Sequence, residues 1–233
     1  MYEILPPEAD EWVRTVGLAQ PPTEYDPVGS ACLPTGNVAI LYPQPFSYIR
    51  GTLDITGTVK GDPATYDYFW VDYGPGLFPQ EWTKIEGNRG EQIENGILQT
   101  WNTAGLNGLF TLRLVLVKKD PNGGPPSFEN STVVVTVDNQ PPTVGVLAPT
   151  SNQAFTVGTD DSVVIQADVQ DNLSVARVVF FVDNIGAESA TAPPYSTRWK
   201  ITAAERGPHT IVVRAYDAAG NYTDSEKVTI TVK

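Results

Sequence analysis

Cysteine and histidine are almost absent from the chain, which contains one of each, Cys32 and His209. A single cysteine cannot form an internal disulfide, so packing alone must hold the fold together. A single histidine without a cysteine cluster excludes the usual zinc arrangements. No serine lies in the nucleophile-elbow motif of a serine hydrolase. We therefore expect a structural role for His209, which the strand pattern places on the same face as Ile211 and Val213.

Positive charge and long apolar runs are also scarce. The chain has 15 Lys and Arg residues against 27 Asp and Glu residues, which gives a formal net charge of -12 at pH 7. This balance argues against a nucleic-acid partner and against contact with an anionic membrane, because both surfaces attract basic residues. No apolar run approaches the roughly 18 residues of a membrane-spanning helix. We therefore expect no membrane insertion within this segment.

What the chain does have is one strand pattern that occurs twice. The first copy consists of Gly108, Thr111, Leu112, Leu114 and Leu116, followed by Val133, Val135 and Val137. The second copy consists of Gly207, Thr210, Ile211, Val213 and Ala215, followed by Val228, Ile230 and Val232. Trp101 and Trp199 precede the two copies, and we expect both in the core. Each copy has the length of one immunoglobulin-like unit, so the pattern predicts an all-β fold of two tandem immunoglobulin-like β-sandwiches.

Alternating apolar residues between Gly, Pro, Asn and Asp turn residues predict the individual strands. In the first sandwich they cover residues 38–42, 49–59, 66–73, 81–85, 92–101, 109–117 and 132–137. In the second sandwich they cover residues 144–147, 162–169, 176–182, 195–201, 210–216 and 227–232.

Composition divides the chain into three parts. Residues 1–33 read as a proline-rich connector with a short amphipathic helix at residues 8–18, and residues 34–138 and 139–233 read as the two sandwiches. Pro141 and Pro142 lie at the junction and predict a semi-rigid link. Because the start does not resemble a signal peptide, we expect the chain to be the carboxy-terminal part of a longer protein that is anchored by a segment upstream.

One predicted strand is rich in aromatic residues. Alternation places Tyr68 and Trp70 on one face and Phe69 and Val71 on the other. Tyr68, Trp70 and Trp82 are therefore candidates for a glycan or partner surface. The alternative is that these rings only cover the sheet or pack against the connector.

Acidic turn residues suggest one metal candidate. The loops after the second and sixth strands of the second sandwich lie at the end where the chain enters, which would bring together Asp138, Asn139, Asp168, Asp171 and Asp217. Calcium takes six to eight oxygen ligands from such side chains and from backbone carbonyls. The alternative is that these residues serve only as turn formers. No other cofactor is expected.

The residues from Gly207 to Asp217, followed by Gly220 and Asn221, resemble the bacterial immunoglobulin-like modules of secreted and surface proteins, and the resemblance spans residues 142–233. Residues 96–103, with 105–108 and 111–114, look like an extracellular bacterial sandwich that is seen beside cell-wall enzymes. Residues 5–8, with Trp12 and Gly17, are similar to the connector that follows the transpeptidase domain of class A penicillin-binding proteins.

These resemblances imply a noncatalytic accessory region of a penicillin-binding protein, a spacer or docking surface at the cell surface or cell wall. The implied partners are the upstream catalytic domains of the same chain, together with peptidoglycan or cell-envelope proteins. The serine and lysine signatures of the transpeptidase are absent, so no catalytic residue is carried over. The alternative function is a carbohydrate-binding or adhesion module of another secreted bacterial enzyme, and a hydrolase acting alone is the remaining class.

Overall fold

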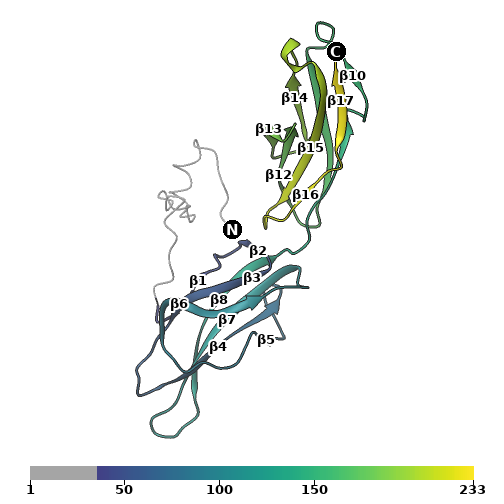
Figure 1. The fold of residues 1–233 in the computed structure, drawn as a ribbon. Helices are drawn as coiled ribbons and strands as arrows, with labels where there is room; N and C mark the ends of the chain where they lie inside the picture. The colour runs from purple at the N-terminus through teal and green to yellow at the C-terminus, as the bar shows by residue number, and fades with distance from the viewer. Residues whose placement is uncertain (1–35) are drawn as a thin grey trace, which may run out of the picture. The chain divides into compact units, whose positions relative to one another are not determined.

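The computed structural model describes residues 36–233, whose regular secondary structure is almost entirely β-strand (Figure 1). The connector, its expected helix at residues 8–18 and Cys32 lie outside the described residues. The described chain forms two β-sandwiches in series, and each has its own hydrophobic core. The prediction of an all-β tandem of sandwiches is confirmed.

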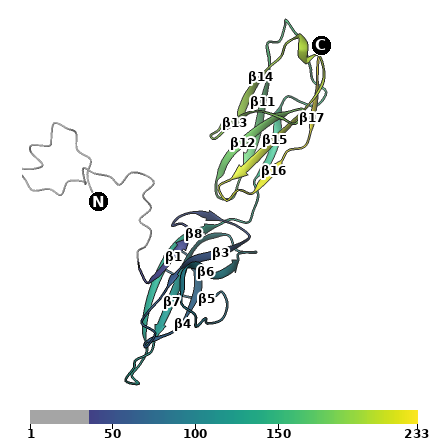
Figure 2. The same ribbon diagram turned by 60° about the vertical axis from the view of Figure 1, so that its left-hand side comes forward.

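The first sandwich packs a three-stranded sheet against a five-stranded sheet (Figure 2). The smaller sheet contains, in spatial order, β1 (Val38–Tyr42), β3 (Thr52–Val59) and β6 (Ile93–Asn102). The larger sheet contains β2 (Tyr48–Ile49), β8 (Ser127–Val137), β7 (Gly108–Lys118), β4 (Tyr66–Pro75) and β5 (Thr83–Lys84).

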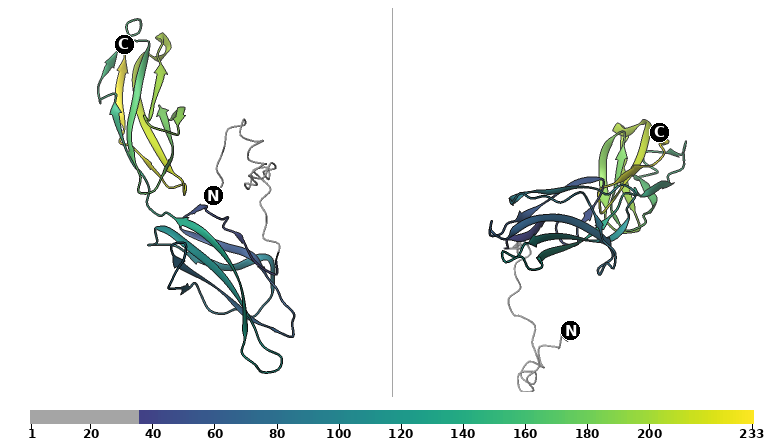
Figure 3. Two further views of the ribbon diagram at one scale, coloured as in Figure 1. Left: turned by 180° about the vertical axis from the view of Figure 1, so that it is seen from behind. Right: turned by 90° about the horizontal axis from the view of Figure 1, so that it is seen from below.

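The second sandwich repeats this order of strands (Figure 3). Its smaller sheet contains β14 (Ser196–Lys200), β11 (Ser162–Gln170) and β9 (Thr143–Ala148). Its larger sheet contains β10 (Ala154–Phe155), β17 (Val228–Val232), β15 (Gly207–Asp217), β12 (Val175–Val182) and β13 (Ile185–Ala190), with β16 (Tyr222–Asp224) paired to β15. A single 3₁₀ turn, η2 (Ala203–Glu205), precedes β15 in the described chain.

The repeated sequence pattern lies on equivalent strands of the two sandwiches, β7 and β15. Gly108 at the start of β7 pairs with Val137, and Gly207 at the start of β15 pairs with Val232. Both glycines have positive φ values, 105° and 135°, which side chains with a Cβ rarely tolerate. The sequence pattern therefore occurs twice because both sandwiches use the same backbone conformation at the start of this strand and the same alternation of apolar residues along it.

Three strands of the second sandwich lie outside the predicted segments: β10, β13 and β16. Almost every residue of β13 is exposed, so no apolar alternation marks it in the sequence. The strand is held by backbone pairing with β12, from Val178 opposite Ala190 to Val182 opposite Ile185.

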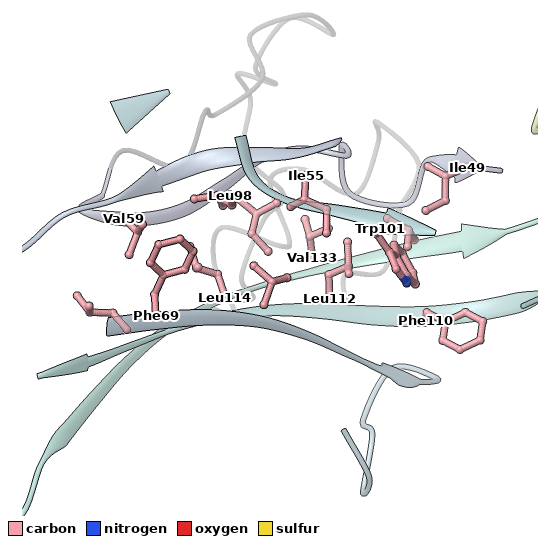
Figure 4. Packing of buried hydrophobic residues seen from close by; sticks show 14 of the residues in the cluster. Ile49, Ile55, Val59, Phe69, Leu98, Trp101, Phe110, Leu112, Leu114 and Val133 are labelled. Carbon is pink, nitrogen blue, oxygen red and sulfur yellow. The ribbon is translucent and has the colours of Figure 1, made fainter. Parts of the chain in front are cut away.

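Alternation along β7 builds the core of the first sandwich (Figure 4). Leu112, Leu114 and Leu116 are fully buried, and Figure 4 shows Leu112 and Leu114 pointing toward Ile55 and Leu98 of the smaller sheet. Each buried leucine contributes about 1.5–3 kcal/mol relative to an exposed one. In the second sandwich the same role belongs to three buried residues of β15, which are Ile211, Val213 and Ala215.

The two matched tryptophans differ in burial. Trp101 on β6 is 1% exposed and packs against Tyr73 and Phe110, with ring centroids 5.0 and 6.4 Å away. Trp199 on β14 packs against the second core, as expected, but it remains partly exposed. The position of Phe110 is taken by His209, whose ring lies 4.8 Å from that of Trp199. A polar ring at the end of the sandwich leaves its tryptophan accessible to solvent.

His209 has the structural role expected for it, because both ring nitrogens meet acceptors. Its Nδ1 lies 2.6 Å from Oδ2 of Asp183, and its Nε2 contacts the backbone carbonyl of Glu205. Two acceptors are both satisfied only by an imidazolium, which carries two N–H donors. Burial opposes this charged form, but the hydrogen bonds and charges of Asp183 and Glu205 raise the pKa of His209 above its ordinary value.

Trp101→Ala is expected to lower the free energy of unfolding by about 3–5 kcal/mol, because it removes a fully buried side chain and leaves a cavity between the sheets. Trp199→Ala serves as the comparison and is expected to cost less, since part of that ring already contacts solvent. Chemical denaturation of both variants measures the difference. A loss below about 1 kcal/mol for Trp101→Ala would place this ring outside the core.

The stabilising effect of the His209–Asp183 pair is expected to decline at alkaline pH. A pKa that is raised on folding stabilises the protein fully below the unfolded-state pKa, and this contribution is lost as the pH rises through the folded-state pKa. The melting temperature of the wild type relative to Asp183→Asn should therefore be highest near pH 6 and fall toward pH 9, roughly. Parallel pH profiles for the two proteins would show that the imidazolium is not formed.

Candidate functional site

Three acidic side chains converge where the first sandwich ends and the second begins. Asp138 follows β8, Asp171 follows β11, and Asp217 is the last residue of β15. One carboxylate oxygen from each lies within 4.8 Å of the other two. Asp138 and Asp217 are buried, and Asp171 is partly exposed. These three residues form the junction cluster.

Turn chemistry holds two members of the junction cluster in place. Oδ1 of Asp171 accepts backbone N–H groups from Leu173 at 2.9 Å and Ser174 at 2.7 Å. Asp217 accepts from Asn221 twice, through the backbone N–H at 2.8 Å and the side-chain amide at 2.6 Å. Both loops thus fold around a carboxylate, as Asp commonly does in turns.

The third member, Asp138, is the most enclosed. Its exposed fraction is 0%, and Oδ1 accepts a single hydrogen bond, from the N–H of Gln140 at 3.1 Å. Its Oδ2 is buried without a hydrogen-bond partner, and so is Oδ2 of Asp171. Asn172 lies close enough to favour the charged form of Asp138, yet it makes no hydrogen bond to Oδ2. Buried polar atoms without a partner are rare in proteins.

Electrostatic repulsion acts on this site. Burial raises the pKa of Asp138, the Gln140 N–H opposes that shift, and the charges of Asp217 and Asp171 raise the pKa further. Among the described residues, no lysine, arginine or histidine forms a salt bridge with any of the three acids. The negative charge of the junction cluster is therefore uncompensated by a direct ion pair.

Two basic residues near the junction cluster, Arg50 in space and Arg177 in sequence, have other partners. Arg50, in the loop before β3, donates from Nη1 to the side-chain oxygen of Asn221 at 3.0 Å. Arg177, which is close to Asp171 in sequence, stacks over the ring of Tyr216 at 4.3 Å. Sequence reasoning did not single out Arg50, because its partner is 171 positions away in the chain.

The other two candidate metal residues, Asp168 and Asn139, do not belong to the junction cluster. Asp168 is exposed on β11, opposite Gly145, and is not among the three converging acids. Asn139 turns into the first sandwich, where Oδ1 accepts from the N–H of Gly51 at 2.7 Å and Nδ2 donates to the carbonyls of Thr103 and Leu106, both at 2.9 Å.

The aromatic candidates lie on the face of β4 that points away from the core. Phe69 and Val71 are buried, whereas Tyr68 and Trp70 are partly exposed, as alternation predicts. The rings of Tyr68 and Trp70 lie 6.1 Å apart. Trp82, in the segment before β5, is also partly exposed.

Cations already contact the aromatic rings of this face. The ammonium of Lys84 lies 4.4 Å from the centre of the Trp70 ring, and the guanidinium of Arg113 lies 3.7 Å from that of Trp82. Arg113 also pairs with Asp72 through two hydrogen bonds of 3.0 and 2.8 Å. Each ring therefore has a neighbouring cation on one face, which leaves less of it for stacking on a sugar.

An open hollow on the second sandwich is lined in part by Trp199 and His209. Its three acidic side chains have partners within the fold: Asp183 contacts His209, Glu188 accepts a hydrogen bond from Thr197, and Glu205 accepts one from the backbone N–H of Thr202. These groups stabilise the turn and the adjacent strands. Their contacts therefore fit a structural role better than a catalytic one.

Within the described residues, no helix is long and apolar enough to cross a membrane.

Comparisons with known proteins agree with this architecture. Residues 142–213 match the family model of the bacterial Ig domain, and no curated protein matches the chain. The fibronectin(III)-like modules of Clostridium thermocellum CbhA are 25% identical over 84% of this chain and 93% of that chain, with a TM-score of 0.51. The FN1–FN3 domains of chicken CNTN1 are 16% identical over 82% of this chain and 62% of that chain, with a TM-score of 0.41.

The match to the family model covers most of the second sandwich, and the likeness to the CbhA modules extends over both. The chain is therefore an all-β tandem of immunoglobulin-like or fibronectin III-like sandwiches, and residues 142–213 of its second sandwich are similar to the bacterial Ig domain.

Proposed function

We propose that this chain is a noncatalytic spacer in the extracytoplasmic part of a bacterial cell-wall enzyme. The observation that carries the proposal is the hydrogen-bonded junction between the two sandwiches. A spacer keeps its two ends at a defined separation, so the link between its modules must be ordered. Five residues, 138–142, separate β8 from β9, and two of them are proline.

The first half of this link is fixed to the first sandwich. Besides its side-chain hydrogen bonds, Asn139 donates its backbone N–H to Oδ1 of Asn107 at 2.8 Å. The second half is fixed to the loop of the second sandwich, because Asn221 donates from Nδ2 to the carbonyl of Asp138 at 2.9 Å. A flexible linker would leave these groups to water, whereas here they bind the folded modules.

The cell-wall context rests on resemblance. The bacterial Ig domain match supports a bacterial module, and modules of this kind are attached to many unrelated catalytic domains. The connector resemblance at residues 5–8 favours a class A penicillin-binding protein as the parent. In that protein the partners would be its own upstream catalytic domains, with peptidoglycan or envelope proteins as docking surfaces outside the cytoplasm.

The gene upstream of Met1 tests the parentage. We expect it to encode a transpeptidase domain with its serine-x-x-lysine and lysine-threonine-glycine signatures. An upstream region without these signatures would refute the assignment to a penicillin-binding protein and leave only the spacer role.

The rigidity of the spacer depends on Asn139. Asn139→Ala is expected to lower the free energy of unfolding by about 1–3 kcal/mol, because Gly51, Thr103 and Leu106 lose their partner. Small-angle scattering should show a broader distribution of interdomain distances. Asn122→Ala, at an exposed position in the β7–β8 loop, is the matched control and should change neither property. A scattering curve unchanged by Asn139→Ala would contradict the ordered link.

Carbohydrate binding is the second candidate function, and it is favoured by the partial exposure of Tyr68, Trp70 and Trp82 on one region of the first sandwich. The cations on the rings of Trp70 and Trp82 argue for a covered sheet instead. We therefore expect no retention of the chain by a glycan array.

The result that would reverse this preference is specific. Tight glycan binding that is lost in Trp70→Ala but kept in Phe128→Ala would establish the carbohydrate-binding function. Phe128 is a suitable control because it is 61% exposed on β8 and belongs to neither core.

A further inference from the structure

We propose that Asp138, Asp171 and Asp217 bind one calcium ion at the junction of the two sandwiches. The inference does not depend on the identity of the parent protein. It goes beyond the spacer function because it assigns a ligand to the junction and adds that ligand to the hydrogen bonds that order the link.

The observation that points to a ligand is separate from the clustering of the acids. Oδ2 of Asp138 is buried without a hydrogen-bond partner on a side chain that is 0% exposed. Oδ2 of Asp171 is buried without a partner as well. A buried oxygen without a donor destabilises the folded state, and more so when it is charged. A cation between these oxygens would remove that cost.

The groups around Asp138 supply no donor to its free oxygen. Asp171 accepts two backbone N–H groups, and Asp217 accepts two N–H groups from Asn221, so these donors are already used by the other two acids. No described lysine, arginine or histidine forms a salt bridge with any of the three acids.

The donor atoms select the type of cation. All three side chains offer oxygen, and neither histidine nor cysteine is part of the group, which favours a hard cation over zinc. The three carboxylate oxygens lie within 4.8 Å of one another, so one ion can contact all of them. Calcium takes oxygen ligands in a flexible geometry and fills its remaining positions with water, whereas magnesium usually binds through one or two carboxylates.

The positions of the three acids in the chain indicate how calcium binding would affect the structure. Asp138 belongs to the link that follows β8, whereas Asp171 and Asp217 belong to the β11–β12 and β15–β16 turns of the second sandwich. An ion held by all three would tie the link to that sandwich. Because the unfolded chain does not bring these residues together, calcium would stabilise the folded state by mass action.

Isothermal titration of the chelator-treated chain with calcium chloride tests the proposal. We expect one site per chain and a melting temperature that rises with calcium and returns to its original value in excess EGTA. Asp171→Asn keeps the shape of the side chain but removes its charge, and it should weaken binding by at least about tenfold. Asp168→Asn removes an exposed acid that is outside the cluster, so it should bind calcium like the wild type.

Asp138→Asn gives a readout that does not require bound metal. In EGTA it should melt above the wild type, because it removes a buried charge that faces two others, and calcium should no longer raise its melting temperature. Destabilisation of Asp138→Asn in EGTA would overturn the proposal, since it would mean that the carboxylate is already satisfied. Identical wild-type melting in calcium and EGTA would also overturn it. An equal response to magnesium would refute the assignment to calcium.

Discussion

Apolar packing between two sheets is the interaction on which each half of this chain depends. No disulfide is available within the chain, because Cys32 is its only cysteine. The two cores are therefore built by side-chain alternation alone, from the leucines of β7 in the first sandwich and from Ile211, Val213 and Ala215 on β15 in the second. Equal strand order in both sandwiches follows from this shared alternation and from the glycine that begins each central strand.

Equivalent ends of the two sandwiches serve different purposes. In the first, Trp101 closes the core with Tyr73 and Phe110, and the link beyond Val137 is held by hydrogen bonds to the loops of the same end. In the second, His209 replaces the phenylalanine and forms a charged pair with Asp183. The same arrangement of strands can thus end in an apolar aromatic cluster or in an ion pair, provided that the strands between the ends keep their alternation of buried apolar residues.

Local patterns in the sequence were sufficient to predict the fold, and long-range contacts explain what was missed. Alternation along β7 and β15 identified the central strands, and paired glycines fixed their starts. Strand β13 escaped prediction because its residues are exposed and only backbone pairing holds it. Trp199 was expected in the core because its strand position matches that of Trp101, but burial depends on the neighbouring ring, which the strand pattern does not specify.

At the junction, too, local sequence patterns do not specify the long-range contacts. Turn composition indicated which acids lie near the link, but Asp168 and Asp171 are three positions apart and only the end of β11 decides which one faces Asp138. The contact of Arg50 with Asn221 joins distant parts of the chain and leaves no local signal.

The central claim is that the link between the sandwiches is an ordered part of the fold. Nitrogen-15 relaxation of the backbone amides of Asp138, Asn139 and Gln140 measures this order directly. The account predicts order parameters of about 0.85, as in the flanking strands β8 and β9. Values below about 0.6 for these three amides would show a flexible tether and would contradict it.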